Sequence, residues 1–499
     1  MAKANFETPA FRSYPVIPIL KPGVMKGEGP FVAKPHMQEP LGYPGELVEN
    51  WQEVAISKMG ELLKKYRSLR VYLDACVKCG ACTDKCHYMI GTADPKNMPV
   101  ARQDLLRQVY RRYFTLAGKL FPKLVGAKDL TKDVLDDWYN YYHQCSQCRR
   151  CSVFCPYGID TADISMAARE ILDSVGKGQK YCNEIISKVY KIGNNLGLPK
   201  PALRNTLEGL EEDIKDDTGV DVRLPLDEVG AEVLVITPSA DFFAEPHIDG
   251  LIGYAKVFHQ TGISWTLSSK ASEAANFGMF IGSYENMRSI AMRIREAALD
   301  LKVKRIIFGE CGHAWRVAYS FLNTLAGPFD FLDQRYPIPQ HICEFTYDLI
   351  QKGALKIDKS ANDHHKVTFH DSCNVARGSR MGNMPGGQFI IPREIIKACC
   401  NYYYDMPADT IHDQTYCCGG GGGLLTDDLI ELRVKGALPR MESLKHVVDN
   451  FGVTHMAAIC AICKSQFAKV LPYYGFKMDQ IVSVHQLVSN AIVLEVSEF

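Results

Sequence analysis

The chain has 499 residues, enough for three or four domains with sizeable cores. Its 57 basic and 57 acidic side chains cancel, so the composition gives no support for a nucleic-acid partner or for binding to an anionic membrane surface. No run of 18 apolar residues predicts a membrane span, and the N-terminus lacks the pattern of a signal peptide. Since the 18 cysteines fall in ladder spacings, we expect a reducing compartment and a cytoplasmic redox protein.

The first 48 residues hold eight prolines, which predicts an extended arm, and its apolar pieces favour contact with a partner over a free tail. Helical spacing follows at 49–72, 99–121 and 131–145, and helices are expected to about residue 215. A charged linker is expected at 211–223. On the helix at 99–121, a solvated face is expected for four arginines, with a docking face as the alternative: Arg102, Arg107, Arg111 and Arg112.

Two cysteine ladders share the spacing C-x2-C-x2-C-x3-C. They are Cys76, Cys79, Cys82 and Cys86, and then Cys145, Cys148, Cys151 and Cys155. In two-cluster ferredoxins the fourth cysteine of each run ligates the other cluster. We therefore predict an α-helical ferredoxin domain at 49–215 with two cubane [4Fe–4S] clusters, the first on Cys76, Cys79, Cys82 and Cys155 and the second on Cys145, Cys148, Cys151 and Cys86. Sequential ligation is the alternative, whereas a zinc site would need only two C-x-x-C pairs.

From Ala231 the pattern changes to short buried-strand runs that alternate with helical segments. The runs are AEVLVITP, VKRIIFGE, HKVTFHD and THMAAIC. This alternation predicts an α/β fold with a largely parallel sheet.

Five further cysteines form a set in the last part of the chain: Cys373, Cys417, Cys418, Cys460 and Cys463. A shift of 149 residues places Cys460 on Cys311 and Cys463 on Ala314, and it places the adjacent pair on two serines. Such internal similarity predicts a duplicated domain, with a degenerate copy at 231–350 and an intact copy at 362–499.

Tandem C…CC-G…C-x-x-C sets behind two ferredoxin ladders resemble the catalytic subunits of the heterodisulfide reductase (HdrD) family. Within it, the chain is similar to the DsrK-type subunits of DsrMKJOP membrane complexes, although His87 rather than proline follows Cys86. The resemblance implies a non-cubane [4Fe–4S] cluster on the five cysteines, where a disulfide or trisulfide is reduced. It also implies a haem b membrane subunit as partner, a DsrC-like sulfur carrier protein as substrate, and membrane association through partner subunits.

The residues are compatible with that chemistry. Five cysteines exceed what one cubane needs, and adjacent Cys417 and Cys418 suit a distorted cluster with a bridging thiolate. Residues 419–423 are all glycine, which lets the backbone approach a cluster closely. Reduction of a disulfide releases one sulfur as thiolate, which a cluster iron can bind.

Several neighbouring residues have two interpretations. Three residues could donate a proton to the leaving thiolate: His370, Asp371 and His412. We favour the alternative, that they are hydrogen-bonded residues of the core. Cys311 is expected to be a buried remnant, and His313 and Arg316 are candidates for a pocket that takes an acidic tail. The remaining cysteines are expected to be structural: Cys182, Cys343, Cys399 and Cys400. Three tyrosines are expected to pack around the clusters: Tyr139, Tyr141 and Tyr142.

Two other functions fit parts of the pattern. Iron–sulfur subunits of quinone-linked glycerol-3-phosphate or lactate dehydrogenase systems combine the same ladders and C…CC-G repeats. A purely electron-transferring scaffold without a substrate site is the second alternative. The degenerate first repeat and the proline-rich arm favour the disulfide or trisulfide oxidoreductase.

Overall fold

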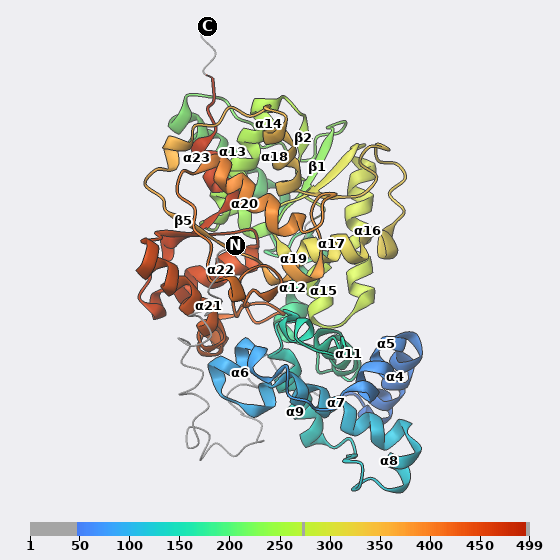
Figure 1. Cartoon of the computed structure of the whole chain (residues 1–499). Helices are drawn as coiled ribbons and strands as arrows, with labels where there is room; N and C mark the ends of the chain where they lie inside the picture. Colours follow the sequence, from blue (N-terminus) through green and yellow to red (C-terminus); the bar gives the residue numbers. More distant parts are fainter. Residues whose placement is uncertain (1–46, 272–274, 496–499) are drawn as a thin grey trace. The chain divides into compact units, whose positions relative to one another are not determined.

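The computed structural model describes residues 47–271 and 275–495, so the predicted arm at 1–48 lies almost entirely outside the described residues (Figure 1). The chain divides into two compact units. Unit 1 runs to Glu184 and adds Phe277–Tyr284 and Tyr416–Glu442; unit 2 comprises Ile185–Asn276, Glu285–Thr415 and Ser443–Phe499. The segment with Cys417 and Cys418 therefore folds with the ladders. The predicted division at 231–350 and 362–499 stays a prediction.

Unit 1 is helical around a core that includes Leu106, Trp138 and Ile164. In α4, the buried residues Ala55, Met59 and Leu62 fall on one helical face. The helices and 3-10 turns of the unit, most of α15 included, are α4 (Trp51–Lys65), α5 (Arg67–Ala75), η1 (Thr83–Lys85), α6 (His87–Thr92), η2 (Pro95–Asn97), α7 (Pro99–Phe114), α8 (Leu116–Leu120), α9 (Lys132–His143), α10 (Arg150–Val153), α11 (Thr161–Ser174), α15 (Ala275–Phe280) and η7 (Asp427–Leu429). Two more helices begin in unit 1: α12 (Lys180–Ile192) and α21 (Ile430–Phe451).

The prediction of a linker at 211–223 is wrong over residues 211–218, where helix α13 (Lys200–Thr218) continues. Leu207, Leu210 and Ile214 are buried along one face of this helix. It ends at Gly219, whose φ of 71° provides a left-handed cap. The apolar spacing therefore determines the structure here, and the acidic side chains occupy the exposed face.

Unit 2 contains two sheets in which every strand pairing is parallel. The first has the order β2-β1-β3-β4, built from β1 (Val233–Ile236), β2 (Trp265–Thr266), β3 (Arg305–Phe308) and β4 (Gln340–His341). The second has the order β5-β6-β7, built from β5 (Val367–His370), β6 (His455–Ala458) and β7 (Ile481–Ser483). The four predicted strand runs contain β1, β3, β5 and β6, so the parallel α/β character is confirmed within a predominantly helical chain.

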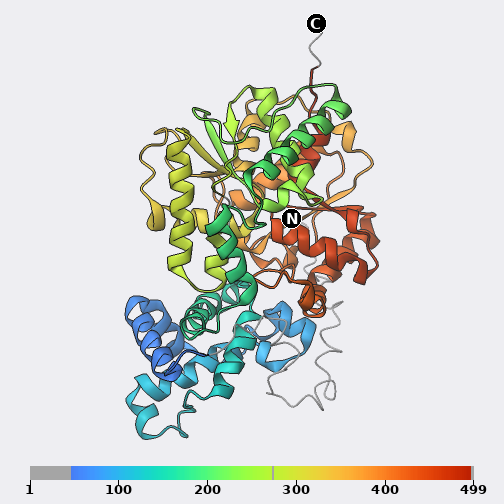
Figure 2. The same ribbon diagram turned by 180° about the vertical axis from the view of Figure 1, so that it is seen from behind.

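The helices of unit 2 flank these strands, as Figure 2 shows for the green and yellow segments that include α13, α14 and α16. Helices α14 and α23 pack so closely that a Cβ at Gly253 would lie 2.1 Å from the carbonyl oxygen of His485. The remaining elements are α14 (His247–Thr261), α16 (Tyr284–Asp300), α17 (Gly312–Ala326), α18 (Ile342–Gln351), α19 (Cys373–Gly378), α20 (Gly387–Cys399), α22 (Ala461–Val470) and α23 (Val484–Ala491), with 3-10 turns η3 (Ser239–Phe242), η4 (Lys359–Asn362), η5 (Ala408–Thr410), η6 (His412–Gln414), η8 (Leu471–Tyr474) and η9 (Met478–Gln480). Among the described residues, no helix is both long and apolar enough to cross a bilayer.

Candidate iron–sulfur sites

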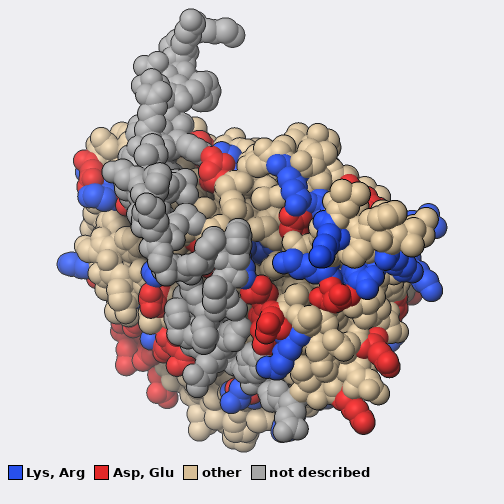
Figure 3. Space-filling view, turned by 90° about the horizontal axis from the view of Figure 1, so that it is seen from below, with Lys and Arg blue, Asp and Glu red and all other residues tan. Residues whose placement is uncertain are grey.

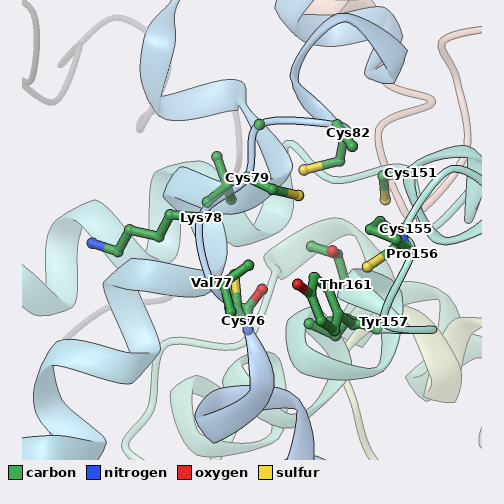
Figure 4. Close-up of a pocket in the computed structure, with 15 residues that line it drawn as sticks. Cys76, Val77, Lys78, Cys79, Cys82, Cys151, Cys155, Pro156, Tyr157 and Thr161 are labelled. Carbon is green, nitrogen blue, oxygen red and sulfur yellow. The ribbon is translucent and has the colours of Figure 1, made fainter.

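Cysteines from both ladders line one hollow of about 390 Å³ in unit 1. They are Cys76, Cys79, Cys82, Cys151 and Cys155. Figure 4 shows the side chains of Cys79, Cys82 and Cys155 directed toward one another across this space. The first ladder loop passes through left-handed backbone at Lys78 and Gly80. Four of these five cysteines are the set that the crossed pattern assigns to the first cluster.

A second hollow of about 340 Å³ lies in the same unit, and Cys151 lines both. Its cysteines are Cys86, Cys145, Cys148 and Cys151, the set that the crossed pattern assigns to the second cluster. The second ladder loop has left-handed backbone at Gln147 and Arg149. These positions match Lys78 and Gly80 of the first ladder, so the two loops share one backbone conformation.

Arg102 of α7 is fully buried and contacts the second set of cysteines. Its Nη1 donates to Sγ of Cys86 at 3.5 Å, and its Nε donates to the carbonyl oxygen of Tyr141 at 3.0 Å. Burial raises the pKa of the Cys86 thiol, but the charges of Arg102 and His87 outweigh burial and lower it below its ordinary value. A cationic side chain thus favours the thiolate that iron requires.

The predicted solvated face is therefore wrong for Arg102 and also for Arg107, which is buried and donates to the carbonyl oxygen of Cys76 at 2.7 Å. The signal that could have found Arg102 is its spacing to Leu106 and Val109. These three residues share one face of α7, and all are buried.

His87 lies between the first ladder and the CC-G segment. It is buried, with Nε2 2.7 Å from Oγ of Ser146 and Nδ1 2.8 Å from the carbonyl oxygen of Gly436. Burial lowers its pKa, but its interactions with Cys417 and Cys86 raise it more, so the net shift is upward. The residue that replaces the usual proline therefore connects a predicted cubane ligand to a predicted ligand of the third cluster.

The CC-G segment packs against the second ladder within unit 1. The backbone N–H groups of Gly419 and Gly420 donate to Sγ of Cys417 at 3.4 Å and of Cys418 at 3.5 Å. Such hydrogen bonds to ligand sulfur tune iron–sulfur clusters. Gly422 has φ of 73°, and a Cβ there would lie 2.7 Å from the carbonyl oxygen of Cys145. The glycine run thus allows a close approach that a side chain would prevent.

The other three predicted ligands of the third cluster lie in unit 2 and are buried: Cys373, Cys460 and Cys463. Cys460 precedes α22 and interacts with Cys463, Cys311 and His313, whose Nδ1 lies 3.6 Å from its Sγ. Burial raises the pKa of Cys460, but these hydrogen bonds hold it well below its ordinary value. Cys311 is buried, as expected of a remnant, yet it contacts a predicted ligand. Binding of one cluster by all five cysteines stays a prediction.

A buried charge network supports the helix that follows Cys460. Nζ of Lys464 lies 3.1 Å from Glu310, and both side chains are fully buried. Glu310 also accepts from the backbone N–H of His485 at 2.9 Å, and from Oγ of Ser483. Burial raises the pKa of Glu310, but Lys464 and His485 lower it far more, so the pair is ionised. Because Lys464 follows Cys463, this network fixes the first turn of α22.

Other predicted candidates have structural partners. Asp371 pairs with Arg393 at 2.7 Å, and this pairing outweighs burial and lowers the pKa of Asp371, so it is a poor proton donor. Arg316 is buried and donates to Oδ1 of Asn374 at 2.9 Å, and its part in a pocket for an acidic tail stays a prediction. The cysteines expected to be structural and the three tyrosines are all buried: Cys182, Cys343, Cys399, Cys400, Tyr139, Tyr141 and Tyr142.

Residues 72–159 match the family model of the 4Fe–4S dicluster domain, which covers both ladders. The eight thiols around two hollows and this match define an iron–sulfur electron-transfer protein. The "Hdr-like menaquinol oxidoreductase iron-sulfur subunit" of Archaeoglobus profundus is 42% identical over 90% of this chain and 84% of the relative. A second protein of that name, from Archaeoglobus fulgidus, is 42% identical over 90% of this chain and 85% of the relative.

A more distant relative is a dihydromethanophenazine:CoB--CoM heterodisulfide reductase subunit of Methanosarcina barkeri, 24% identical over 85% of this chain and 95% of the relative. No solved structure matches the chain. At 42% identity over nearly the full length, the chain belongs to the family of Hdr-like menaquinol oxidoreductase iron–sulfur subunits. It is an oxidoreductase subunit that binds [4Fe–4S] clusters and transfers electrons.

Proposed function

We propose that this chain relays electrons between a membrane partner and a third, non-cubane [4Fe–4S] cluster, where a disulfide or trisulfide of a small sulfur carrier protein is reduced. In this proposal the ladders hold two cubanes with crossed ligation. The third cluster is held by Cys373, Cys417, Cys418, Cys460 and Cys463. The observation that carries the proposal is His87, which follows Cys86 directly and interacts with Cys417.

Two contacts within unit 1 support a short route from the second cubane to the CC-G segment. One is the contact of His87 with Cys417; the other is the close approach of Gly422 to the backbone of Cys145. Tyr88 adds a third connection, because its hydroxyl donates to the carbonyl oxygen of Gly419 at 2.6 Å. Close packing of this kind fixes the separation of donor and acceptor.

The thiols of the proposed third site fit a cluster. All five cysteines are buried, the pKa of Cys460 lies well below its ordinary value, and backbone N–H groups donate to Cys417 and Cys418. When bound, the cluster would supply an iron that takes the thiolate released from the substrate. The partners of Cys460 favour its thiolate, and burial keeps water from all five ligand sulfurs.

The relatives support both ends of this relay. The Archaeoglobus relatives are named as subunits of a menaquinol oxidoreductase, and this name favours a quinol-linked membrane partner for this chain. The Methanosarcina relative is named as a subunit of a heterodisulfide reductase, and this name favours disulfide chemistry at the third cluster. The specific form that we propose is a DsrK-type subunit, with a haem b membrane subunit of a DsrMKJOP-like complex as partner and a DsrC-like carrier as substrate.

A single-turnover reaction tests the function. The reduced full-length chain is mixed with a trisulfide-linked carrier protein, and the released thiols are counted. We expect Cys460→Ser to abolish thiol release, whereas Cys399→Ser, a buried cysteine outside the proposed set, retains it. Thiol release at the normal rate in Cys460→Ser would overturn the proposed role of the third cluster, and no thiol release from the unaltered chain would favour the electron-transferring scaffold.

A further inference from the structure

Helix α8 is drawn at the bottom of Figure 1, and apolar side chains of this helix and of the turn after it are exposed. Leu116 and Leu120 belong to α8, and Phe121 and Leu124 follow it in the next turn. Between 61% and 85% of each of these four side chains is exposed. Four large apolar residues within nine positions form a patch rather than scattered surface residues, and such patches mark binding surfaces.

Positive charge surrounds this patch. Lys119, Lys123 and Lys128 are exposed, and the sequence has no acidic residue from Leu105 to Lys128. Within the part of the chain that the structure describes, Lys119 and Lys123 make no ion pair. The next acidic residue, Asp129, is paired with Arg112 at 2.6 Å. The zero net charge of the chain therefore conceals a local basic region; Figure 3 shows lysine and arginine gathered unevenly on the face that it views.

The segment is held in a defined conformation. Oγ1 of Thr115 accepts from the backbone N–H of Gly118 at 3.1 Å and caps α8. Nη1 of Arg111 donates to the carbonyl oxygen of Val125 at 2.8 Å. The backbone N–H of Ala127 donates to the carbonyl oxygen of Pro122 at 2.8 Å. A Cβ at Gly118 would lie 1.9 Å from the carbonyl oxygen of Arg111, so α8 packs directly on the end of α7.

We propose that residues 116–128 form a membrane-surface anchor, which inserts its leucine and phenylalanine side chains between anionic lipid headgroups. Interfacial segments combine apolar side chains with lysines in this manner, and both contribute to binding. A standard protein interface uses roughly 20–30 residues on each side, and this segment offers fewer. This proposal stands apart from the third cluster, because lipid binding requires neither disulfide chemistry nor a partner subunit.

Vesicle flotation of the full-length chain tests the anchor. We expect the chain to float with vesicles of phosphatidylglycerol and phosphatidylcholine, to bind pure phosphatidylcholine far less, and to dissociate as salt is added. Leu120→Ser with Leu124→Ser should lower the partition coefficient at least tenfold. Lys119→Glu should lower it about fivefold or more, since each lysine near an anionic surface contributes about that factor.

Matched controls separate the anchor from general surface effects. Leu196→Ser and Lys352→Glu alter exposed residues elsewhere and should leave flotation unchanged. A Phe121→Trp variant should gain fluorescence that brominated lipids quench, which reports insertion directly. Absence of flotation, or flotation that the substitutions in 116–128 do not alter, would overturn the proposal. It would equally be overturned if those substitutions left vesicle binding intact and abolished binding to a detergent-solubilised membrane subunit.

Discussion

Nη1 of Arg102 lies 3.5 Å from Sγ of Cys86, and the side chain of Arg102 is almost completely buried. The interior screens this charge less than water would, so the guanidinium acts strongly on the sulfur. Reduction adds negative charge to a cluster, and a nearby cation favours the reduced state. Arg102 is therefore expected to raise the reduction potential of the cluster that Cys86 binds.

Substitution of Arg102 tests this relationship. Arg102→Gln removes the charge, and we expect the potential of one of the two proposed cubanes to fall by on the order of 50 mV in an EPR-monitored titration. Arg102→Lys should recover part of the loss. Arg112→Gln is the control, because Arg112 lies on the same helix, is partly exposed and pairs with Asp129. Equal potentials in the wild type and Arg102→Gln would refute the expected effect.

His87 should control the rate at which electrons pass beyond the cubanes. In His87→Ala the contact with Cys417 is lost, and we expect the signals of both proposed cubanes to persist while reduction of the proposed third cluster slows at least tenfold. Freeze-quench EPR after addition of a reductant measures this rate. His446→Ala, a partly exposed position on α21, should behave as the wild type. An unchanged rate in His87→Ala would show that electrons take another route.

The buried pair Lys464–Glu310 should contribute strongly to the stability of unit 2. Lys464→Met leaves the Glu310 carboxylate buried without its cation, and we expect a loss of about 3–5 kcal/mol in the free energy of unfolding. Addition of Glu310→Gln should restore part of that loss, because the uncompensated charge is then gone. Lys445→Met breaks an exposed pair with Asp449 and should cost less than about 1 kcal/mol. Denaturant titration at fixed pH measures all four proteins, and equal losses for Lys464→Met and Lys445→Met would contradict the argument.

Asp241 should make stability depend on pH. Burial raises the pKa of Asp241 from 3.8 to about 7, more than Lys464 and Thr237 lower it. Between these two pH values the folded state keeps a proton that the unfolded state has released, so stability falls as the pH rises through this window. Asp241→Asn should therefore match the wild type near pH 4 and exceed it by roughly 2–4 kcal/mol at pH 8. A difference between the two proteins that does not vary with pH would contradict the raised pKa.

The sequence predicted the parts of this protein that follow from local pattern. The ladder spacing predicted two cysteine sets, and each set lines one hollow of unit 1. Strand composition predicted β1, β3, β5 and β6, because short apolar runs bounded by helices have few other structures available.

The rest depended on tertiary contacts. The charges of Arg102 and Arg107 indicated exposure to solvent, but both side chains are buried. Carbonyl and sulfur acceptors from distant segments accept their hydrogen bonds and offset the free-energy cost of burying the charges. The acidic side chains at 211–218 suggested a linker, but the buried face of α13 outweighs them. The membership of residues 416–442 in unit 1 follows from contacts such as that of Tyr88 with Gly419, which the spacing of cysteines does not encode.

Iron content and EPR of Cys418→Ser test the central claim most directly. We predict about 12 iron atoms in the wild type, as three four-iron clusters, and a paramagnetic signal that appears when thiol is added to the oxidised protein. Cys418→Ser should retain both cubane signals and about eight iron atoms, and it should lose the thiol-dependent signal. About eight iron atoms and no such signal in the wild type, or an unchanged signal in Cys418→Ser, would contradict the third cluster.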